Sequence, residues 1–322
     1  MSTTQDIIFH WYPHSPFAQK VAWVLNYKKV EYKTVLISMV EPRAARRPLD
    51  GGYRKTPILQ IGNHVYCDSK SIFLALEELY PEPSLYPKLA NGESSEGAAR
   101  AFTMWIDNVL FNNVVSQLPV KDLDDDFLAD RESLAGRKLD RKTLAGGAPF
   151  MKAVIQAEYT IAEKTLGSKT WVLDTESPSL ADFSLAMTTF FCLNLMGEKW
   201  VQANLKAAFG HMQKVLGASD WERTETMPEL TEEEAIDVLK RYQESEVRED
   251  FKVHNTVLPI ALGQQVFVTP LDTGKIPVGG ALVRSTVNET VISYKDANYG
   301  TTTIIHFPAT GFVVVPNLGA KY

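Results

Sequence analysis

The spacing of apolar residues changes twice along this 322-residue chain and divides it into three parts. Residues 1–87 alternate between strand and helix patterns, residues 97–220 have helical spacing throughout, and residues 251–322 are rich in Val, Ile and Thr. A chain of this length exceeds one comfortable hydrophobic core. We therefore predict two or three packed units, with residues 221–250 as an acidic linker.

The first part has the pattern of a strand, a crossover helix and a second strand, followed by a hairpin and another helix. Such a strand–helix–strand unit favours a parallel strand pair with a right-handed connection. The residues before the hairpin carry two prolines and a Gly-Gly pair, which predict an irregular loop. The expected elements are a strand over 6–11, a helix over 16–27, a strand over 31–37, a loop over 39–55, a hairpin over 57–67 and a helix over 69–80.

The second part is expected to be all-helical and the third part to be a small antiparallel sheet or barrel. Between them, Asp220 to Asp250 contain twelve acidic and four basic residues. The helix expected over 229–246 is therefore interpreted as a solvated linker. The helices expected in the second part cover 98–117, 148–166, 180–196 and 201–216, and turn signals in the third part occur at 272–274, 279–280, 288 and 298–300.

Composition excludes several classes of protein and partner. Hydrophobic residues make up 45% of the chain and charged residues 22%, as in an ordinary globular protein. The net charge of −6 offers no basic surface for nucleic acid or an anionic membrane, so neither is an expected partner. Cys67 and Cys192 form neither a disulfide framework nor a zinc site, and the N-terminus lacks a signal-peptide pattern. We expect a cytoplasmic protein without a metal.

Three turns in the first part carry polar residues at helix starts and strand ends. Ser15 and the proline after it have the order of an N-cap and a first helical residue. The proline after Thr56 cannot donate a ladder hydrogen bond, which limits it to the start or edge of a strand. Asp68 and Ser69 offer a carboxylate and a hydroxyl at the start of the next helix. In the expected topology these turns lie at one end of a small sheet.

These features together resemble the glutathione transferase superfamily over roughly residues 5–220. The run 15–20, Ser-Pro-Phe-Ala-Gln-Lys, is similar to the start of the family's active-site helix, and the run 178–183, Pro-Ser-Leu-Ala-Asp-Phe, to its buried capping box. The resemblance implies an α/β thioredoxin-like domain with the order β-α-β-β-β-α over 1–87 and an all-α domain over 97–220. The β-rich extension over 251–322 lies outside the family's common two-domain pattern, so the chain resembles an atypical member.

The resemblance further implies glutathione as the cofactor. Thr56 and Pro57 match the family's cis-proline strand, where Thr56 would hold the cysteinyl backbone of the tripeptide as an added strand. Asp68 and Ser69 match its acid-serine pair and would receive the γ-glutamyl amine and carboxylate at a helix N-terminus. Lys55 is a further, weaker contact to the tripeptide.

The same resemblance implies a residue that activates the glutathione sulfur. Ser15, at the start of the first helix, would donate a hydrogen bond to the sulfur and so favour the thiolate over the thiol. Tyr12 lies close by in the sequence and is the alternative donor. Omega-type members have a cysteine at the position of Ser15, so the serine disfavours thiol–disulfide chemistry.

The electrophilic substrate is expected beside the sulfur, between the two domains, where pockets commonly form. In the family, the first helix of the second domain lines this pocket. Here Trp105, Asn108, Phe111 and Asn112 fall on neighbouring turns of such a helix, and His14 and Phe17 are further candidates beside Ser15.

Three functions follow from these expectations. The first is a glutathione transferase, in which the thiolate attacks a small apolar electrophile. The second is a glutathione-dependent isomerase, in which reversible thiolate addition converts cis and trans double bonds, as in the zeta-type enzymes whose fuller Ser-Ser-Cys pattern is absent. The third is a non-catalytic binding or regulatory protein, for which the β-rich extension is the main argument. By analogy with the family, a homodimer is expected.

Overall fold

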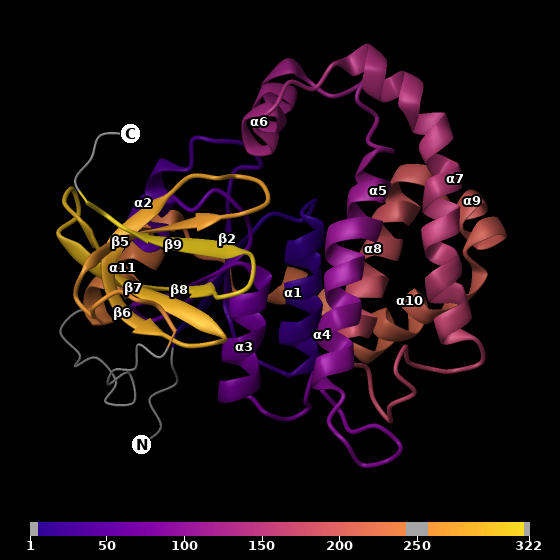
Figure 1. The fold of residues 1–322 in the computed structure, drawn as a ribbon, viewed down its shortest axis with the longest axis horizontal. Helices are drawn as coiled ribbons and strands as arrows, with labels where there is room; N and C mark the ends of the chain where they lie inside the picture. Colours follow the sequence, from indigo (N-terminus) through magenta and orange to yellow (C-terminus); the bar gives the residue numbers. More distant parts are fainter. Residues whose placement is uncertain (1–5, 243–256, 319–322) are drawn as a thin grey trace.

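The computed structural model describes residues 6–242 and 257–318, in which a mixed sheet lies beside a bundle of helices (Figure 1). The N-terminal unit has the order of elements that the sequence predicts. Its main elements are β1 (Ile7–Trp11), α1 (Pro16–Tyr27), β2 (Lys33–Leu36), β3 (Ile58–Ile61), β4 (His64–Cys67) and α3 (Ser69–Leu79).

The strand pairs of this unit confirm the predicted topology. β1 pairs with β2 in parallel, and β1 with β3 and β3 with β4 in antiparallel fashion. Helices α1 and α3 cover one face of these strands, where Phe9 and Leu59 pack against Val21 and Ile72. Residues at alternating positions of the same strands, such as Ile8 and Ile58, enter separate clusters of buried side chains. The strands are therefore buried on both faces.

The loop expected over 39–55 contains two short helices that sequence analysis missed. They are η1 (Ala44–Arg46) and α2 (Arg47–Asp50), and Gly51 ends the second in the left-handed conformation, at φ 61°. Two of the residues that predicted an irregular loop, Pro48 and Gly51, stand here at the start and the end of α2. Pro48 stands in the first turn, where its missing N–H costs no helical bond.

The second part of the chain is helical, as predicted. α8 begins at Leu180 and ends at Met196, as expected, and its start is the Ser179–Asp182 capping box. Asp182 accepts a 2.7 Å hydrogen bond from the Ser179 backbone N–H and lies 2.8 Å from His211 Nε2, which confirms a buried structural box. The helices are α4 (Glu96–Trp105), η2 (Ile106–Leu110), α5 (Phe111–Val115), α6 (Asp125–Ala135), α7 (Arg141–Leu166), α8, α9 (Glu198–Asn204), α10 (Lys206–Ala218) and η3 (Trp221–Thr226).

Four helix predictions for this part differ from the structure. The helix expected over 98–117 begins at Glu96, contains the π-helical turn η2 and ends at Val115. α6 was not predicted, because none of its side chains is buried and its sequence lacks an apolar stripe. α7 starts at Arg141 rather than 148, since Asp140 caps it and the helix continues through Pro149. The helix expected over 201–216 is two helices separated at Leu205.

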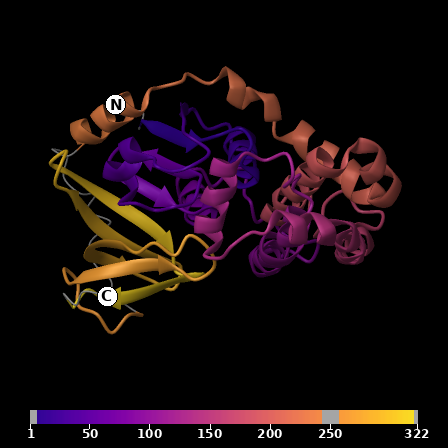
Figure 2. The ribbon, with the colours of Figure 1, turned by 90° about the horizontal axis from the view of Figure 1, so that it is seen from above.

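The C-terminal strands are antiparallel to one another, as predicted, but they do not form a sheet of their own. β8 pairs in parallel with β4 through Tyr66 and His306, so that one sheet runs in the order β2-β1-β3-β4-β8-β7-β6-β5-β9. Figure 2 shows these strands as a curved layer next to the N-terminal unit. The five strands are β5 (Gln265–Pro270), β6 (Val278–Ser285), β7 (Glu289–Asp296), β8 (Thr301–Pro308) and β9 (Phe312–Pro316).

The turn predicted at Gly279-Gly280 is wrong, because both glycines lie inside β6. A Cβ atom on Gly280 would lie 2.8 Å from the carbonyl oxygen of Ser293 on β7. The absence of a side chain therefore permits a close strand approach rather than a reversal of the chain.

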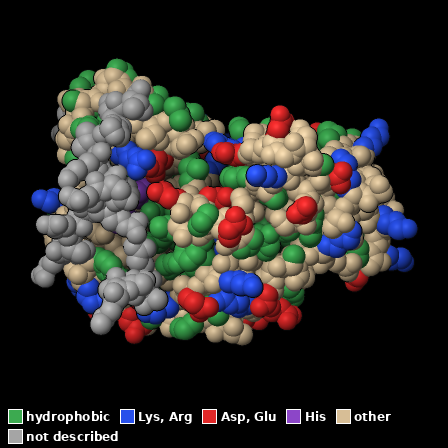
Figure 3. All heavy atoms as spheres, turned by 90° about the horizontal axis from the view of Figure 1, so that it is seen from below, with side chains coloured by type: hydrophobic (Ala, Val, Ile, Leu, Met, Phe, Trp, Pro, Cys, Tyr) green, Lys and Arg blue, Asp and Glu red, His purple; other side chains and the backbone are tan. Residues whose placement is uncertain are grey.

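The acidic helix is part of the core and not a solvated linker, which corrects the sequence interpretation. α11 (Glu232–Tyr242) buries Ala235, Ile236, Val238 and Leu239. These side chains pack on the face of the sheet opposite α1 and α3, together with residues of β2 and β4. The acidic residues lie on its outer side; the remainder of the expected helix, 243–246, lies outside the described residues. In the view of Figure 3, acidic and basic side chains are interspersed over the surface.

Candidate functional site

The register of three strands brings the predicted turns together at one end of the sheet. His10 pairs with Ile58, and Ile58 pairs with Cys67. The turn after β1, the residues before β3 and the turn after β4 therefore lie side by side. These segments carry Ser15, Thr56 and Asp68, respectively.

Ser15 is the N-cap of α1, as predicted. Its Oγ accepts a 3.3 Å hydrogen bond from the Ala18 backbone N–H, and Pro16 follows in the first helical turn. The side chain is buried at the positive end of the helix dipole. Because its lone pair faces Ala18, the Ser15 hydroxyl has its own proton to donate to a neighbouring acceptor.

Thr56 stands directly before β3, and its peptide bond to Pro57 is cis. The ladders of β3 with both neighbours begin at Ile58, so the backbone of Thr56 lies beyond the paired part of the sheet. An extended peptide that lies along Thr56 can therefore pair with its backbone groups, which is strand addition at a sheet end.

Asp68 caps α3 and accepts a 3.0 Å hydrogen bond from the Lys70 backbone N–H. Its φ of 77° is unusual for a residue with a side chain, and strained positions of this kind cluster at ligand-binding sites. Burial disfavours its charged form, but Lys70, Lys55 and the Lys70 N–H outweigh burial and hold the pKa of Asp68 below its usual range. Asp68 is thus an anion next to the buried Ser69.

A buried ion pair that sequence analysis missed joins α1 to the helical bundle. Lys20 is completely buried, and its Nζ lies 2.7 Å from Asp107 Oδ2 and 3.3 Å from Ser184 Oγ. Burial lowers the pKa of Lys20, and Asp107 partly offsets this effect. The charge of Lys20 also acts on Asp68. The only sequence signal was a lysine within the apolar stripe of α1.

The expected substrate-pocket residues divide into two groups. Phe17 and Phe111 meet across the boundary between the domains, with ring centroids 4.9 Å apart. Trp105 instead turns toward α7, where its Nε1 donates a 3.0 Å hydrogen bond to Glu158. His14 is exposed.

The helix that carries the predicted pocket residues is interrupted by the π-helical turn η2, and these residues do not all lie on one of its faces. This turn bonds the Phe111 N–H to the Ile106 carbonyl, five residues back, which shifts the later residues around the helix axis. Asn108 and Asn112 are exposed and donate to backbone carbonyls of the preceding helical turn. Asp107, which lies next to Asn108, faces α1 and pairs with Lys20.

Tyr12 takes a different direction from Ser15. Its half-buried ring packs on the cluster of Ile8, Val35 and Val238, on the face of the sheet that α11 covers. Ser15 instead caps α1, which packs on the opposite face. Only the backbones of Tyr12 and Ser15 are joined, by a 3.1 Å hydrogen bond.

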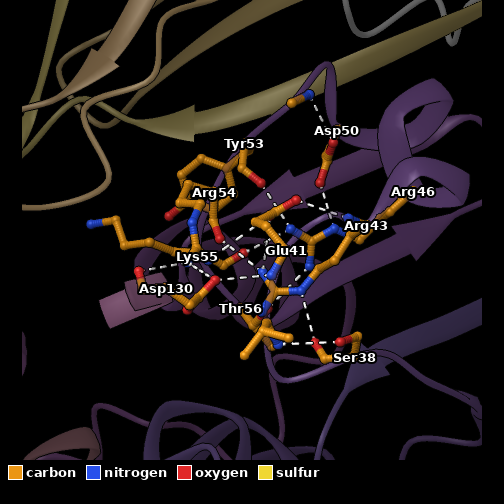
Figure 4. Close-up of polar contacts among 12 residues, drawn as sticks. Ser38, Glu41, Arg43, Arg46, Asp50, Tyr53, Arg54, Lys55, Thr56 and Asp130 are labelled. Carbon is orange, nitrogen blue, oxygen red and sulfur yellow. Dashed lines mark hydrogen bonds and ion pairs between the residues drawn. The ribbon is translucent and has the colours of Figure 1, made fainter. Parts of the chain in front are cut away.

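Arg46 fixes the segment that presents Thr56 (Figure 4). It is buried and donates to Thr56 Oγ1 at 3.1 Å, to the Tyr53 carbonyl at 2.8 Å and to the Lys55 carbonyl at 3.2 Å. Its Nε forms an ion pair with the buried Asp50. Burial raises the pKa of Asp50, and the positive charge of Arg46 offsets part of this rise. Arg46 therefore acts as a positioning residue for this segment.

α6 attaches the helical bundle to the same region. Asp130 Oδ1 on α6 lies 2.7 Å from Arg54 Nη2 and accepts a 2.9 Å hydrogen bond from the Glu41 backbone N–H (Figure 4). Arg131 donates to the Met39 carbonyl at 2.9 Å. In Figure 1, α6 stands above the space between the sheet and the bundle. The polar side chains of α6, because of which the sequence did not predict a helix here, make these contacts with the N-terminal unit.

Cys67 and the pair of His64 and His306 lie in surroundings that indicate a structural role. Burial raises the pKa of the Cys67 thiol well above its usual range, so this cysteine is a poor nucleophile. His64 Nδ1 and His306 Nε2 are 3.0 Å apart and join β4 to β8. Within the described ranges, no cluster of three or more His, Cys, Asp or Glu side chains could hold a metal ion.

Two family models match parts of the sequence. Residues 9–84 match the N-terminal domain of glutathione S-transferases. Residues 112–209 match a domain family of unknown function. No curated protein matches the chain.

Several solved structures have a similar fold. A glutathione S-transferase-like protein from Pseudomonas syringae is 24% identical, with a TM-score of 0.70, and the match covers 97% of this chain and 99% of that protein. A glutathione S-transferase from Methylobacterium radiotolerans, in complex with glutathione sulfonate, is 18% identical, with a TM-score of 0.51 over 70% of this chain and 96% of that one. A bacterial maleyl pyruvate isomerase of the zeta class is 18% identical, with a TM-score of 0.50 over 67% and 95%.

The fold of the first of these similar structures includes the region of the C-terminal strands, since the match spans nearly both chains. Among residues 6–242 and 257–318, no helix has the length and apolar character to span a bilayer.

Proposed function

We propose that this chain, a member of the glutathione S-transferase superfamily by its N-terminal domain and fold, binds glutathione and activates its thiol for attack on a small apolar electrophile. The observation that carries the proposal is the convergence of Ser15, Thr56 and the Asp68–Ser69 pair at one end of the sheet. The Methylobacterium protein with the same fold binds glutathione sulfonate, which supports this choice of ligand.

The residues fit the chemical groups of the tripeptide. Thr56 offers backbone groups beyond the sheet ladders to the cysteinyl residue. Asp68 is held as an anion and suits the γ-glutamyl ammonium group. Ser69 and the N-terminus of α3, an 11-residue helix, suit the adjacent carboxylate.

Ser15 is the donor that the geometry favours for the sulfur. Its Oγ lies at the N-terminus of α1, whereas the ring of Tyr12 packs toward α11. Lowering a thiol pKa from about 8.5 to about 6.5 corresponds to roughly 2.7 kcal/mol. A charge-assisted hydrogen bond together with the helix dipole can supply this amount. The Ser15 hydroxyl keeps its proton, and the thiol proton passes to solvent.

Isomerisation is the second candidate, because one of the similar folds is a maleyl pyruvate isomerase. The thiolate adds to an activated double bond, the resulting single bond rotates, and elimination returns the thiolate. Product analysis separates the two reactions. A stable thioether with loss of glutathione supports transfer, and a changed double-bond geometry without loss of glutathione supports isomerisation.

Asp68→Asn tests the binding site, because asparagine caps helices as well as aspartate does and keeps the fold intact. The variant loses the charge that faces the ammonium group, and we expect glutathione affinity to fall by about tenfold or more in a calorimetric titration. Asp140→Asn is the matched control, since Asp140 caps α7 on the surface of the bundle. Equal affinity of the two variants would contradict the proposed site, and a wild-type chain that does not bind glutathione would contradict the function.

The proposal includes a homodimer and a cytoplasmic location. β8 pairs with β4, so a partner cannot add to the sheet along that strand. α7 exposes Phe150 (79%), Val154 and Ile161 at helical spacing, which offers a second copy an apolar surface. The buried, unpaired Cys67 and Cys192 suit a reducing compartment. Sedimentation of wild type and Phe150→Glu tests the dimer, which the charge is expected to dissociate.

A further inference from the structure

The loop between β5 and β6 reaches the candidate site from a distant part of the chain. Asp272 in this loop accepts hydrogen bonds from Lys55 Nζ through both carboxylate oxygens, at 2.7 and 2.8 Å. The two residues are 217 positions apart in the sequence. The Lys55 side chain is 20% exposed and that of Asp272 is 55% exposed, so this ion pair lies at the rim of the site.

The backbone holds this loop in place on two sides. The Leu271 N–H donates a 2.9 Å hydrogen bond to the Gly311 carbonyl, and the Gly274 N–H donates a 2.8 Å hydrogen bond to the Leu134 carbonyl on α6. Gly274 has a φ of 61°, and a Cβ atom there would lie 3.1 Å from the side chain of Arg54. The position of Asp272 over Lys55 is therefore fixed by the C-terminal strands and the helical bundle together.

The direction of the bound peptide decides which ligand group lies near Lys55. In antiparallel strand addition, residues that follow the paired residue on one strand face residues that precede it on the other. With the cysteinyl residue of glutathione opposite Thr56, the next residue of the ligand faces Lys55. That residue is the terminal glycine, which carries a free carboxylate.

We propose that Asp272 is a specificity-determining residue of the glutathione site, which competes with the ligand's glycyl carboxylate for Lys55. The inference rests on the proposed function. Lys55 has one ammonium group, and Asp272 already binds it through both oxygens. A ligand with a free carboxylate at this end must displace Asp272 or bind beside a second negative charge. A ligand whose terminal carboxylate is an ester or amide meets no such competition.

The other charges of the site do not remove this competition. Lys70 is engaged with Asp68, 3.6 Å away, and Lys20 with Asp107. Asp68 is the main cause of the raised pKa of Lys70, and Asp107 and Asp272 add smaller contributions in the same direction. The C-terminal strands thus add negative charge at the point where the terminal carboxylate of glutathione is expected.

The test compares glutathione with its glycyl ethyl ester in calorimetric titrations of the full chain. Exposed ion pairs contribute up to about 1 kcal/mol, which corresponds to roughly fivefold in affinity. We expect Asp272→Asn to bind glutathione about two to five times more tightly than wild type does. The affinity for the ester is expected to be the same in the variant and in wild type. Asp237→Asn removes the same charge from an exposed pair on α11 and serves as the control. In a Lys55→Gln background, Asp272→Asn is expected to have no effect.

Three results would overturn the inference. The first is a glutathione affinity of Asp272→Asn that equals or falls below that of wild type. The second is an equal gain for the ester, and the third is an equal gain for Asp237→Asn. If neither peptide binds wild type or Asp272→Asn, the proposed function fails and this inference fails with it, whereas glutathione binding without the expected difference overturns the inference alone.

Discussion

Replacement of Arg46 by methionine is expected to destabilise the N-terminal unit and to weaken glutathione binding. Methionine keeps much of the length of the side chain but removes the bonds to Tyr53, Lys55 and Thr56. It also leaves Asp50 buried without its cation. Breaking a buried ion pair by removal of one partner costs about 3–5 kcal/mol in the free energy of unfolding.

Protonation of Asp50 sets an upper limit on the electrostatic part of this cost. An aspartate with an ordinary pKa of 3.8 can be neutralised at about pH 7 for roughly 4.4 kcal/mol. Without Arg46, the folded-state pKa of Asp50 rises further, so the folded variant binds a proton that the unfolded chain does not. The destabilisation by Arg46→Met should therefore shrink as the pH falls from about 7 toward 4.

Urea denaturation followed by tryptophan fluorescence measures this effect. Arg46→Met with Asp50→Asn is the matched control, because asparagine can still accept the 2.8 Å hydrogen bond from the Gly52 N–H. We expect the double variant to recover about 2 kcal/mol or more relative to the single variant. A loss below about 1 kcal/mol, or a loss that does not change with pH, would refute the role assigned to this ion pair.

Two further predictions concern buried titratable groups. Burial lowers the pKa of His10 to about 4 from 6.5, so the unfolded chain binds its proton more readily, and stability should fall by about 2 kcal/mol between about pH 8 and pH 5. Urea titrations should show this component in wild type and lose it in His10→Asn; an equal slope in both would contradict the assignment. Lys20→Met leaves Asp107 buried without its cation and should cost about 3–5 kcal/mol, with partial recovery in Lys20→Met/Asp107→Leu. Additive effects of these two changes would show that the pair is not coupled.

Local sequence signals predicted the parts of the site that depend on local backbone structure. Ser15 lies at a helix start and Asp68 at another, because cap residues act on N–H groups two or three positions away. The strand order of the N-terminal unit then followed from the spacing of its elements. The convergence of the three turns was therefore accessible from the sequence.

Contacts between distant segments could not be predicted in this way. Lys55 meets Asp272 and Lys20 meets Asp107 only because the fold brings together residues far apart in the chain. The pairing of β8 with β4 depends on a register that no turn specifies. The many acidic residues of α11 led to the prediction of a solvated linker. Its position instead depends on the four buried side chains of its apolar face.

The proposed function depends most directly on stabilisation of the bound glutathione thiolate by Ser15. The ultraviolet absorbance of the thiolate, titrated against pH in the complex, measures the pKa of the bound thiol. We expect a pKa near 6.5 in wild type and a return toward about 8.5 in Ser15→Ala, with binding only modestly affected. An identical titration curve in the two proteins would contradict the central claim and would transfer the role to another donor.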